Sequence, residues 1–128
     1  MEILNLTLFS YELFNGKAKI EAQLMTCQNG YKINVCVVAK PSNACSYVDI
    51  LIVGGIINIV NKSMFAICDD ENILEISVKR AISDMINSVT GYFDELVIFD
   101  TMTSSSKNFI DHISDRVIKY IKRLTKNM

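Results

Sequence analysis

Histidine, proline and glycine are scarce in this chain, and each shortage argues against a particular kind of segment or site. Its 128 residues include one histidine, one proline and five glycines. So little proline and glycine leaves hardly any room for flexible linkers or low-complexity segments. The length is that of one domain, which buries about two-thirds of the surface that its unfolded chain exposes. We therefore expect a single domain over residues 1–128.

The residues that usually bind metal ions are also few and widely spaced. Cys27, Cys36, Cys45 and Cys68 include no Cys-x-x-Cys pair, and His112 has no second histidine as a neighbour. Because a zinc site needs converging ligands at short spacings, we predict no metal ion and no other cofactor. Reduced thiols of this kind are typical of the cytosol and nucleus.

A strong charge of one sign and a long apolar run are missing as well. With 13 basic and 14 acidic residues the net charge is −1, which favours neither nucleic acid nor an anionic membrane. The longest apolar run, 48–60, is interrupted by Asp49 and Gly54-Gly55, so it is a poor bilayer span. The first residues lack the basic segment and apolar core of a signal peptide. We expect a cytoplasmic or nuclear protein that binds neither nucleic acid nor membrane.

Two Asn-Gly pairs, at 15–16 and 29–30, predict tight hairpins, because both residue types accept the positive φ of a type I′ turn. The strands would be 3–14, 17–28 and 31–40. With the pairs at the tips, Glu12 faces Lys19 and Leu24 faces Val35. Both registers place one apolar set on the same face, which predicts a three-stranded meander. That face carries Phe9, Tyr11, Leu13, Ala18, Ile20, Ala22, Leu24, Ile33, Val35 and Val37.

The opposite face of this meander is mixed in character. It carries Glu12, Lys19, Glu21, Gln23 and Asn34, and also Leu6, Leu8, Met25, Cys36 and Val38. Two interpretations are open: a sheet face that is half exposed to water, or a face that a partner partly covers.

Two more apolar segments, 49–53 and 56–60, flank Gly54-Gly55 and predict another two-residue hairpin. One face of the hairpin would carry Ile50, Ile52, Ile57 and Ile59. The other would carry Leu51, Val53, Ile56 and Val60, with Asp49 and Asn58. Apolar residues on both faces indicate burial from both sides, by the protein's own layers or by another subunit. A kink at the glycine pair is the alternative, and a short strand near 64–67 follows.

The second half of the chain has the periodicity of helices. Apolar residues at three- and four-residue spacing predict helices over 72–90 and 105–125, with a strand at 95–100 between them. The stripe of the first helix is widened by Ile73, Ile76 and Ile86, which indicates burial on more than one side. The predicted fold class is α+β: an antiparallel β meander or sandwich of about six strands with a C-terminal helix-strand-helix unit.

Basic residues gather on the last helix, on the side opposite its apolar stripe. They are Arg116, Lys119, Lys122, Arg123 and Lys126. A solvated helix face is one interpretation and a docking strip for an acidic protein surface is another. Nucleic acid is the third, but no interleaved aromatic residues support it.

Two catalytic arrangements are compatible with parts of the sequence. A ribonuclease H-like Mg²⁺ site could use Glu75 and Asp100, but Val53 stands where a third carboxylate is needed. Cys36 and His112 could form a thiol–imidazole pair, although nothing in the sequence activates the thiol. We assign no catalytic residue.

Several stretches in this order point to a known family. They are Leu8-Phe9-Ser10-Tyr11-Glu12-Leu13, Ala18-Lys19-Ile20, Tyr31-Lys32-Ile33-Asn34-Val35, the strand at 49–52, the helix at 77–89, Leu96-Val97-Ile98-Phe99, and Asn108-Phe109 followed by Ile113, Arg116, Val117 and Ile118. Over about 5–124 the chain resembles the small proteasome assembly chaperones. It departs from their tryptophan-rich first strands, because it has no tryptophan.

The resemblance implies a non-catalytic protein that pairs with a sister chaperone of the same fold, or with itself in isolation. The pair would escort formation of the proteasome α-subunit ring and leave as β-subunits arrive. Our hypothesis for the chaperone–chaperone contact is Leu51, Val53, Ile56 and Val60. For the contact with α-type subunits it is Arg116, Lys119, Lys122 and Arg123. The alternatives are a ribonuclease H-like nucleic-acid protein and a generic protein-binding adaptor.

Overall fold

The computed structural model describes residues 5–13, 18–39, 45–61, 65–68, 71–90 and 105–126. Its elements are β1 (Asn5–Leu13), β2 (Ala18–Cys27), β3 (Gly30–Ala39), β4 (Cys45–Val53), β5 (Ile56–Asn61), β6 (Phe65–Cys68), α1 (Glu71–Thr90) and α3 (Ser105–Lys126). Both helices follow the predicted ranges closely. The strand predicted at 95–100 and the turn predicted at 15–16 lie outside the described residues.

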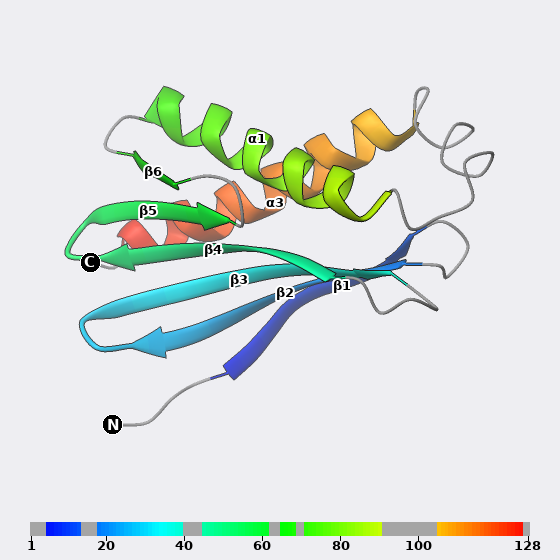
Figure 1. Ribbon diagram of the computed structural model, residues 1–128. Helices are drawn as coiled ribbons and strands as arrows, with labels where there is room; N and C mark the ends of the chain where they lie inside the picture. Colours follow the sequence, from blue (N-terminus) through cyan, green and yellow to red (C-terminus); the bar gives the residue numbers. More distant parts are fainter. Residues whose placement is uncertain are drawn as a thin grey trace.

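The strands form one antiparallel sheet in the order β1-β2-β3-β4-β5-β6, so each strand pairs with its neighbours in the sequence. Figure 1 shows α1 and α3 lying together over one face of this sheet. The α+β class and the antiparallel meander are therefore confirmed, and the described strands belong to a single sheet layer rather than a sandwich. Neither described helix has the uninterrupted apolar length that a membrane crossing requires.

The pairing of β1 with β2 agrees with the prediction near their hairpin and departs from it further along. Glu12 faces Lys19 as expected, but the register shifts between Thr7 and Phe9, and Leu6 then faces Leu24. An extra residue in one strand reverses its inside–outside alternation. Leu6 therefore lies on the helix-covered face, where it is 51% exposed, and Leu8 packs against the core. The prediction that both lie on the opposite face is wrong because of this bulge.

The hairpin between β2 and β3 has its tip at Gln28 and Asn29, not at Asn29-Gly30. Asn29 has a φ of 67°, and Leu24 faces Ile33 instead of Val35. Gly30 belongs to β3, where an added Cβ would lie 2.0 Å from the carbonyl oxygen of Ile52. Glycine is thus required by the close approach of β4 and not by the turn. Because the register differs by two residues, the predicted apolar face is retained.

The hairpin between β4 and β5 is confirmed, which rules out the alternative of a kink. Gly54 and Gly55 have φ values of 60° and 78°, as a type I′ turn requires. Val53 then faces Ile56, and Ile50 faces Ile59. The observed β4 begins at Cys45, earlier than the predicted start of the strand at residue 49.

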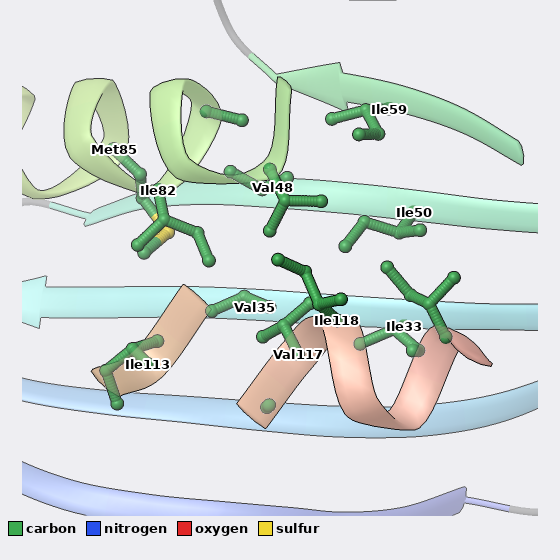
Figure 2. Packing of buried hydrophobic residues seen from close by; sticks show 14 of the residues in the cluster. Ile33, Val35, Val48, Ile50, Ile59, Ile82, Met85, Ile113, Val117 and Ile118 are labelled. Atoms are coloured by element: carbon green, nitrogen blue, oxygen red, sulfur yellow. The ribbon is translucent and has the colours of Figure 1, made fainter. Parts of the chain in front are cut away.

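The core fills the space between the two helices and the sheet. Figure 2 shows Ile82 and Met85 of α1 and Val117 of α3 directed toward strand residues such as Val35. Complete burial stabilises each such side chain by about 1.5–3 kcal/mol relative to exposure. The fully buried members of largest volume are Ile20, Ile33, Ile50, Ile52, Ile59, Ile82, Met85, Ile113, Ile121, Val35, Val37 and Val48.

The prediction that α1 is buried on more than one side is confirmed, because α1 contacts both the sheet and α3, but the prediction is wrong at Ile76. Ile86 is buried, with 4% of its surface exposed, but Ile76 is 68% exposed. The reason is that α1 packs on the sheet and on α3, so its remaining side faces outward in the described structure. A salt bridge of 3.9 Å between Lys79 and Asp111 joins the two helices at their surface. The side chain of Ile73 lies outside the described residues.

Candidate functional site

The sheet face turned away from α1 and α3 is the first candidate surface, and we refer to it as the open face (Figure 1). No described helix covers it. The strand registers align its side chains in rows that cross the sheet. One row runs through Gln23, Asn34, Asp49 and Val60, and the next runs through Met25, Lys32, Leu51 and Asn58.

The β4–β5 hairpin makes one half of the open face apolar. Leu51, Val53, Ile56 and Val60 share this face, as predicted. Val53 is 38% exposed and Ile56 is 52% exposed, while Leu51 and Val60 are half-buried. We call these four residues the apolar patch. Their role in binding a partner stays a prediction.

Sequence reasoning missed one large residue of the open face. Tyr47 faces Cys36 across β3 and β4 and is 44% exposed. The period-two alternation of Leu51 and Asp49, continued toward the N-terminus, would have found it. The prediction stopped short because it began the strand at residue 49.

The half of the open face formed by β2 and β3 is the more polar one, although Met25, Cys36 and Val38 also lie on it, and its charges compensate one another. Asn34 Nδ2 donates a hydrogen bond of 2.7 Å to Asp49 Oδ1, and Lys32 lies 3.8 Å from the same carboxylate. Lys19 lies 3.6 Å from Glu21, which also accepts a hydrogen bond of 3.2 Å from Gln23. A shallow hollow of about 260 Å³ lies here, lined by Lys19, Glu21, Gln23, Asn34, Cys36 and Val38.

Three cysteines also belong to the open face. The registers put Cys27, Cys36 and Cys45 in the same rows as its other residues, and all three are free thiols. Burial is the main factor that raises the pKa of Cys36, with smaller contributions from Cys45 and Glu21. A raised pKa keeps this thiol protonated near neutral pH, which is the opposite of what a nucleophilic cysteine needs.

The basic residues of α3 form a second surface, on the helix-covered side of the sheet. Lys119, Lys122 and Arg123 are exposed, but Arg116 is only partly exposed. Its guanidinium lies 5.0 Å from the centre of the Phe9 ring and 5.6 Å from that of Tyr11, and it donates a hydrogen bond to the Tyr11 hydroxyl. Arg116 therefore fastens α3 to β1, and the structure separates it from the rest of the predicted strip.

The neighbours of Arg116 favour the protonated form of its guanidinium. Desolvation acts to lower the pKa of this guanidinium, but hydrogen bonds to the hydroxyls of Tyr11 and Tyr120 outweigh it, so the pKa is raised. A permanently charged guanidinium over two aromatic rings is a cation–π contact. Beside it, the ring of His112 meets Tyr11 edge-on, with 6.0 Å between ring centres.

The structure does not bring together the catalytic pair considered from the sequence. Cys36 lies on the open face, whereas His112 lies on α3 against the other face, so the sheet separates them. Glu75 is exposed on α1 and lies 3.6 Å from Lys79, and Asp100 is outside the described residues. Within the described ranges, no three His, Cys, Asp or Glu side chains are grouped so as to hold a metal ion.

This chain is therefore an α+β protein with one helix-covered sheet face and one open face. Comparison with known protein families, curated proteins and solved structures finds no match.

Proposed function

We propose that this protein is a non-catalytic assembly chaperone of the proteasome core particle. In this proposal it pairs with a sister chaperone of the same fold and escorts formation of the α-subunit ring. The sequence resembles proteasome assembly chaperone 4 most, with chaperone 3 second. The proposal includes the strand expected at 95–100, which would complete a helix-strand-helix unit.

One observation carries the protein-binding part of the proposal: the apolar patch on the open face. An antiparallel sheet whose second face meets water normally alternates apolar and polar residues. Here Val53 and Ile56 are 38% and 52% exposed, beside the half-buried Leu51 and Val60. Exposed apolar groups that gather in one place favour contact with another protein.

The rest of the open face supports a partner that also presents a sheet. Lys19 pairs with Glu21 and Lys32 with Asp49, and Glu12 opposite Lys19 adds one negative charge, so this part of the face offers little net charge to an incoming surface. A second sheet laid face to face, about 10 Å away and rotated by about 30°, would cover the patch and leave these pairs near the rim. This is how a sister chaperone of the same fold would bind.

The exposed cations of α3, Lys119, Lys122 and Arg123, are the proposed contact with α-type subunits. Arg116 contributes less in this proposal, because it is engaged with Phe9 and Tyr11. The two surfaces lie on opposite sides of the sheet, so a sister chaperone and an α-type subunit would bind without competing.

The experiment is capture of proteasome subunits from the native cell extract by the tagged chain and by two variants. Val53→Lys/Ile56→Glu places opposite charges on residues that face each other, so they compensate within the hairpin while removing the apolar patch. The control, Ile76→Glu, changes an isoleucine that is 68% exposed on α1.

We expect the wild type and the control to capture α-type subunits and a second chaperone but no mature particles. We expect the double variant to lose the second chaperone. If the wild type captures no α-type subunit, the chaperone function is refuted. If the double variant pairs as the wild type does, the open face is not the contact.

A further inference from the structure

The outward side of α3 has a second recess, separate from the open face. Asp115, Ile118, Lys119, Lys122, Arg123 and Lys126 line a shallow hollow of about 370 Å³, which we call the α3 hollow. Ile118 is 8% exposed and forms its apolar floor. The four cations are exposed around it.

The four cations of the hollow do not all stabilise α3, so helix stability alone does not explain their positions. Cations in the last turn of a helix interact favourably with its dipole, and Arg123 and Lys126 lie there. Lys119 and Lys122 lie earlier in the helix. Asp115, four residues before Lys119, compensates part of this charge. Lys119 is nevertheless four residues from Arg123, and Lys122 is four residues from Lys126, a spacing at which like charges destabilise a helix. An anionic group bound in the hollow would offset this repulsion.

The aromatic neighbour of the hollow argues against a nucleic acid as that anion. Binding of single strands uses aromatic rings on which bases stack. The ring of Tyr120 is covered by the guanidinium of Arg123, 5.8 Å from the ring centre. The apolar floor formed by Ile118 fits an aliphatic side chain, which a protein partner has and a phosphate backbone lacks.

The spacing of the cations matches that of a second helix. From Lys119 to Lys126 the helix rises about 10.5 Å, at 1.5 Å per residue. Another helix with carboxylates three and four residues apart would present a row of negative charge at the same intervals.

We propose that the α3 hollow binds an acidic helical segment of a protein partner. Carboxylates at three- and four-residue spacing lie against Lys119, Lys122, Arg123 and Lys126, and one aliphatic side chain lies on Ile118. The inference rests on the proposed function only in taking the partner to be a protein. It concerns this surface alone, so it can fail while the open face still binds a chaperone.

The test measures binding of the full chain to labelled synthetic peptides by fluorescence anisotropy. The probe is a helical peptide of about 20 residues, long enough to be helical in isolation, with glutamates and one leucine along a single stripe. Its isomer has the same composition with the glutamates spread around the helix. An oligothymidylate of equal charge is the third ligand. The protein variants are Lys119→Glu and, as a matched charge reversal on the exposed surface of α1, Arg80→Glu.

We expect the striped peptide to bind more tightly than its isomer and the oligothymidylate, and to weaken as salt is raised. Lys119→Glu should weaken binding about fivefold and Arg80→Glu less than about twofold, with unchanged circular dichroism for both. Equal binding of the isomer or of the oligothymidylate would overturn the inference, because the hollow would then be a general polyanion surface. If the Lys119→Glu variant bound the striped peptide as tightly as the wild type does, the inference would be overturned too. Capture of α-type subunits tests the proposed function separately.

Discussion

Asn34 and Asp49 face each other across β3 and β4, and the amide of Asn34 donates a hydrogen bond of 2.7 Å to the carboxylate of Asp49. This bond lies at the border between the polar and apolar halves of the open face. It joins two strands that the salt bridge between Lys32 and Asp49 also links on that face.

The first prediction concerns this pair. A hydrogen bond to a charged group contributes about 1.5–3 kcal/mol when shielded, and less here because both residues are partly exposed. We expect Asn34→Ala and Asp49→Ala each to lower the free energy of unfolding in urea by about 1 kcal/mol. The double variant should cost less than the sum of the two, since the pair is lost only once. If the loss in the double variant equalled the sum of the two single losses, the hydrogen bond would contribute nothing to stability.

The second prediction tests whether glycine is required at residue 30 by the close approach of β4 or by the conformation of the turn. An alanine Cβ at this position would lie 2.0 Å from the carbonyl oxygen of Ile52, so β3 and β4 must move apart. We expect Gly30→Ala to lower the unfolding free energy by about 3 kcal/mol or more. At Gly55, where φ is 78° and no atom lies within 4 Å, we expect Gly55→Asn to cost less than about 1 kcal/mol.

Gly30→Asn distinguishes steric contact from turn conformation. Asparagine tolerates positive φ, so it would be accepted if Gly30 were a turn residue. We expect Gly30→Asn to be as damaging as Gly30→Ala in urea denaturation. A stable Gly30→Asn protein would contradict the close approach of the two strands.

The third prediction concerns the attachment of α3 to β1 by Arg116. Arg116→Ala removes a guanidinium that lies over Phe9 and Tyr11, and we expect a loss of about 1 kcal/mol in stability. Arg116→Lys should recover only part of this, because lysine lacks the planar group that stacks on a ring.

Arg123→Ala is the matched control for Arg116. Its guanidinium lies 5.8 Å from the ring of Tyr120 within the same helix, so its removal leaves the contact of α3 with β1 intact. Its effect on the unfolding free energy should be smaller than that of Arg116→Ala. Equal losses from the two variants would show that Arg116 has no special role between the elements.

The fourth prediction follows from the raised pKa of Cys36, caused first by burial and then by Cys45 and Glu21. The folded state ionises this thiol less readily than the unfolded state does. The protonated thiol therefore makes its full contribution to the free energy of unfolding below the unfolded pKa of about 8.5. It is lost as the pH rises through the higher folded value. We expect wild-type stability to fall relative to Cys36→Ser as the pH is raised above about 8.5. Parallel stability curves for the two proteins would contradict this.

The parts of the fold that the sequence predicted well are those with two consistent signals. The β4–β5 hairpin combines a glycine pair with alternating isoleucines, so that only one register buries Ile50, Ile52, Ile57 and Ile59 together. The helices likewise have a clear apolar period. The position of the β2–β3 turn was predicted from the Asn-Gly pair alone. Glycine at residue 30 is instead required by a long-range contact with β4.

The surfaces were less predictable than the core. The apolar patch could be foreseen, because its members alternate strictly with buried isoleucines. The role of Arg116 could not, since its rings come from β1, far away in the sequence. The exposure of Ile76 also depends on which side of α1 the sheet and α3 occupy, and helical periodicity alone cannot determine that.

The bulge between Thr7 and Phe9 has a consequence for how the molecule associates. β1 pairs with β2 alone among the described strands, so its outer backbone groups could template a strand from another molecule. A bulge twists such a border away from straight pairing and discourages fibril-like growth. The bulge therefore makes the β1 edge resist sideways polymerisation, while the apolar patch on the open face stays exposed.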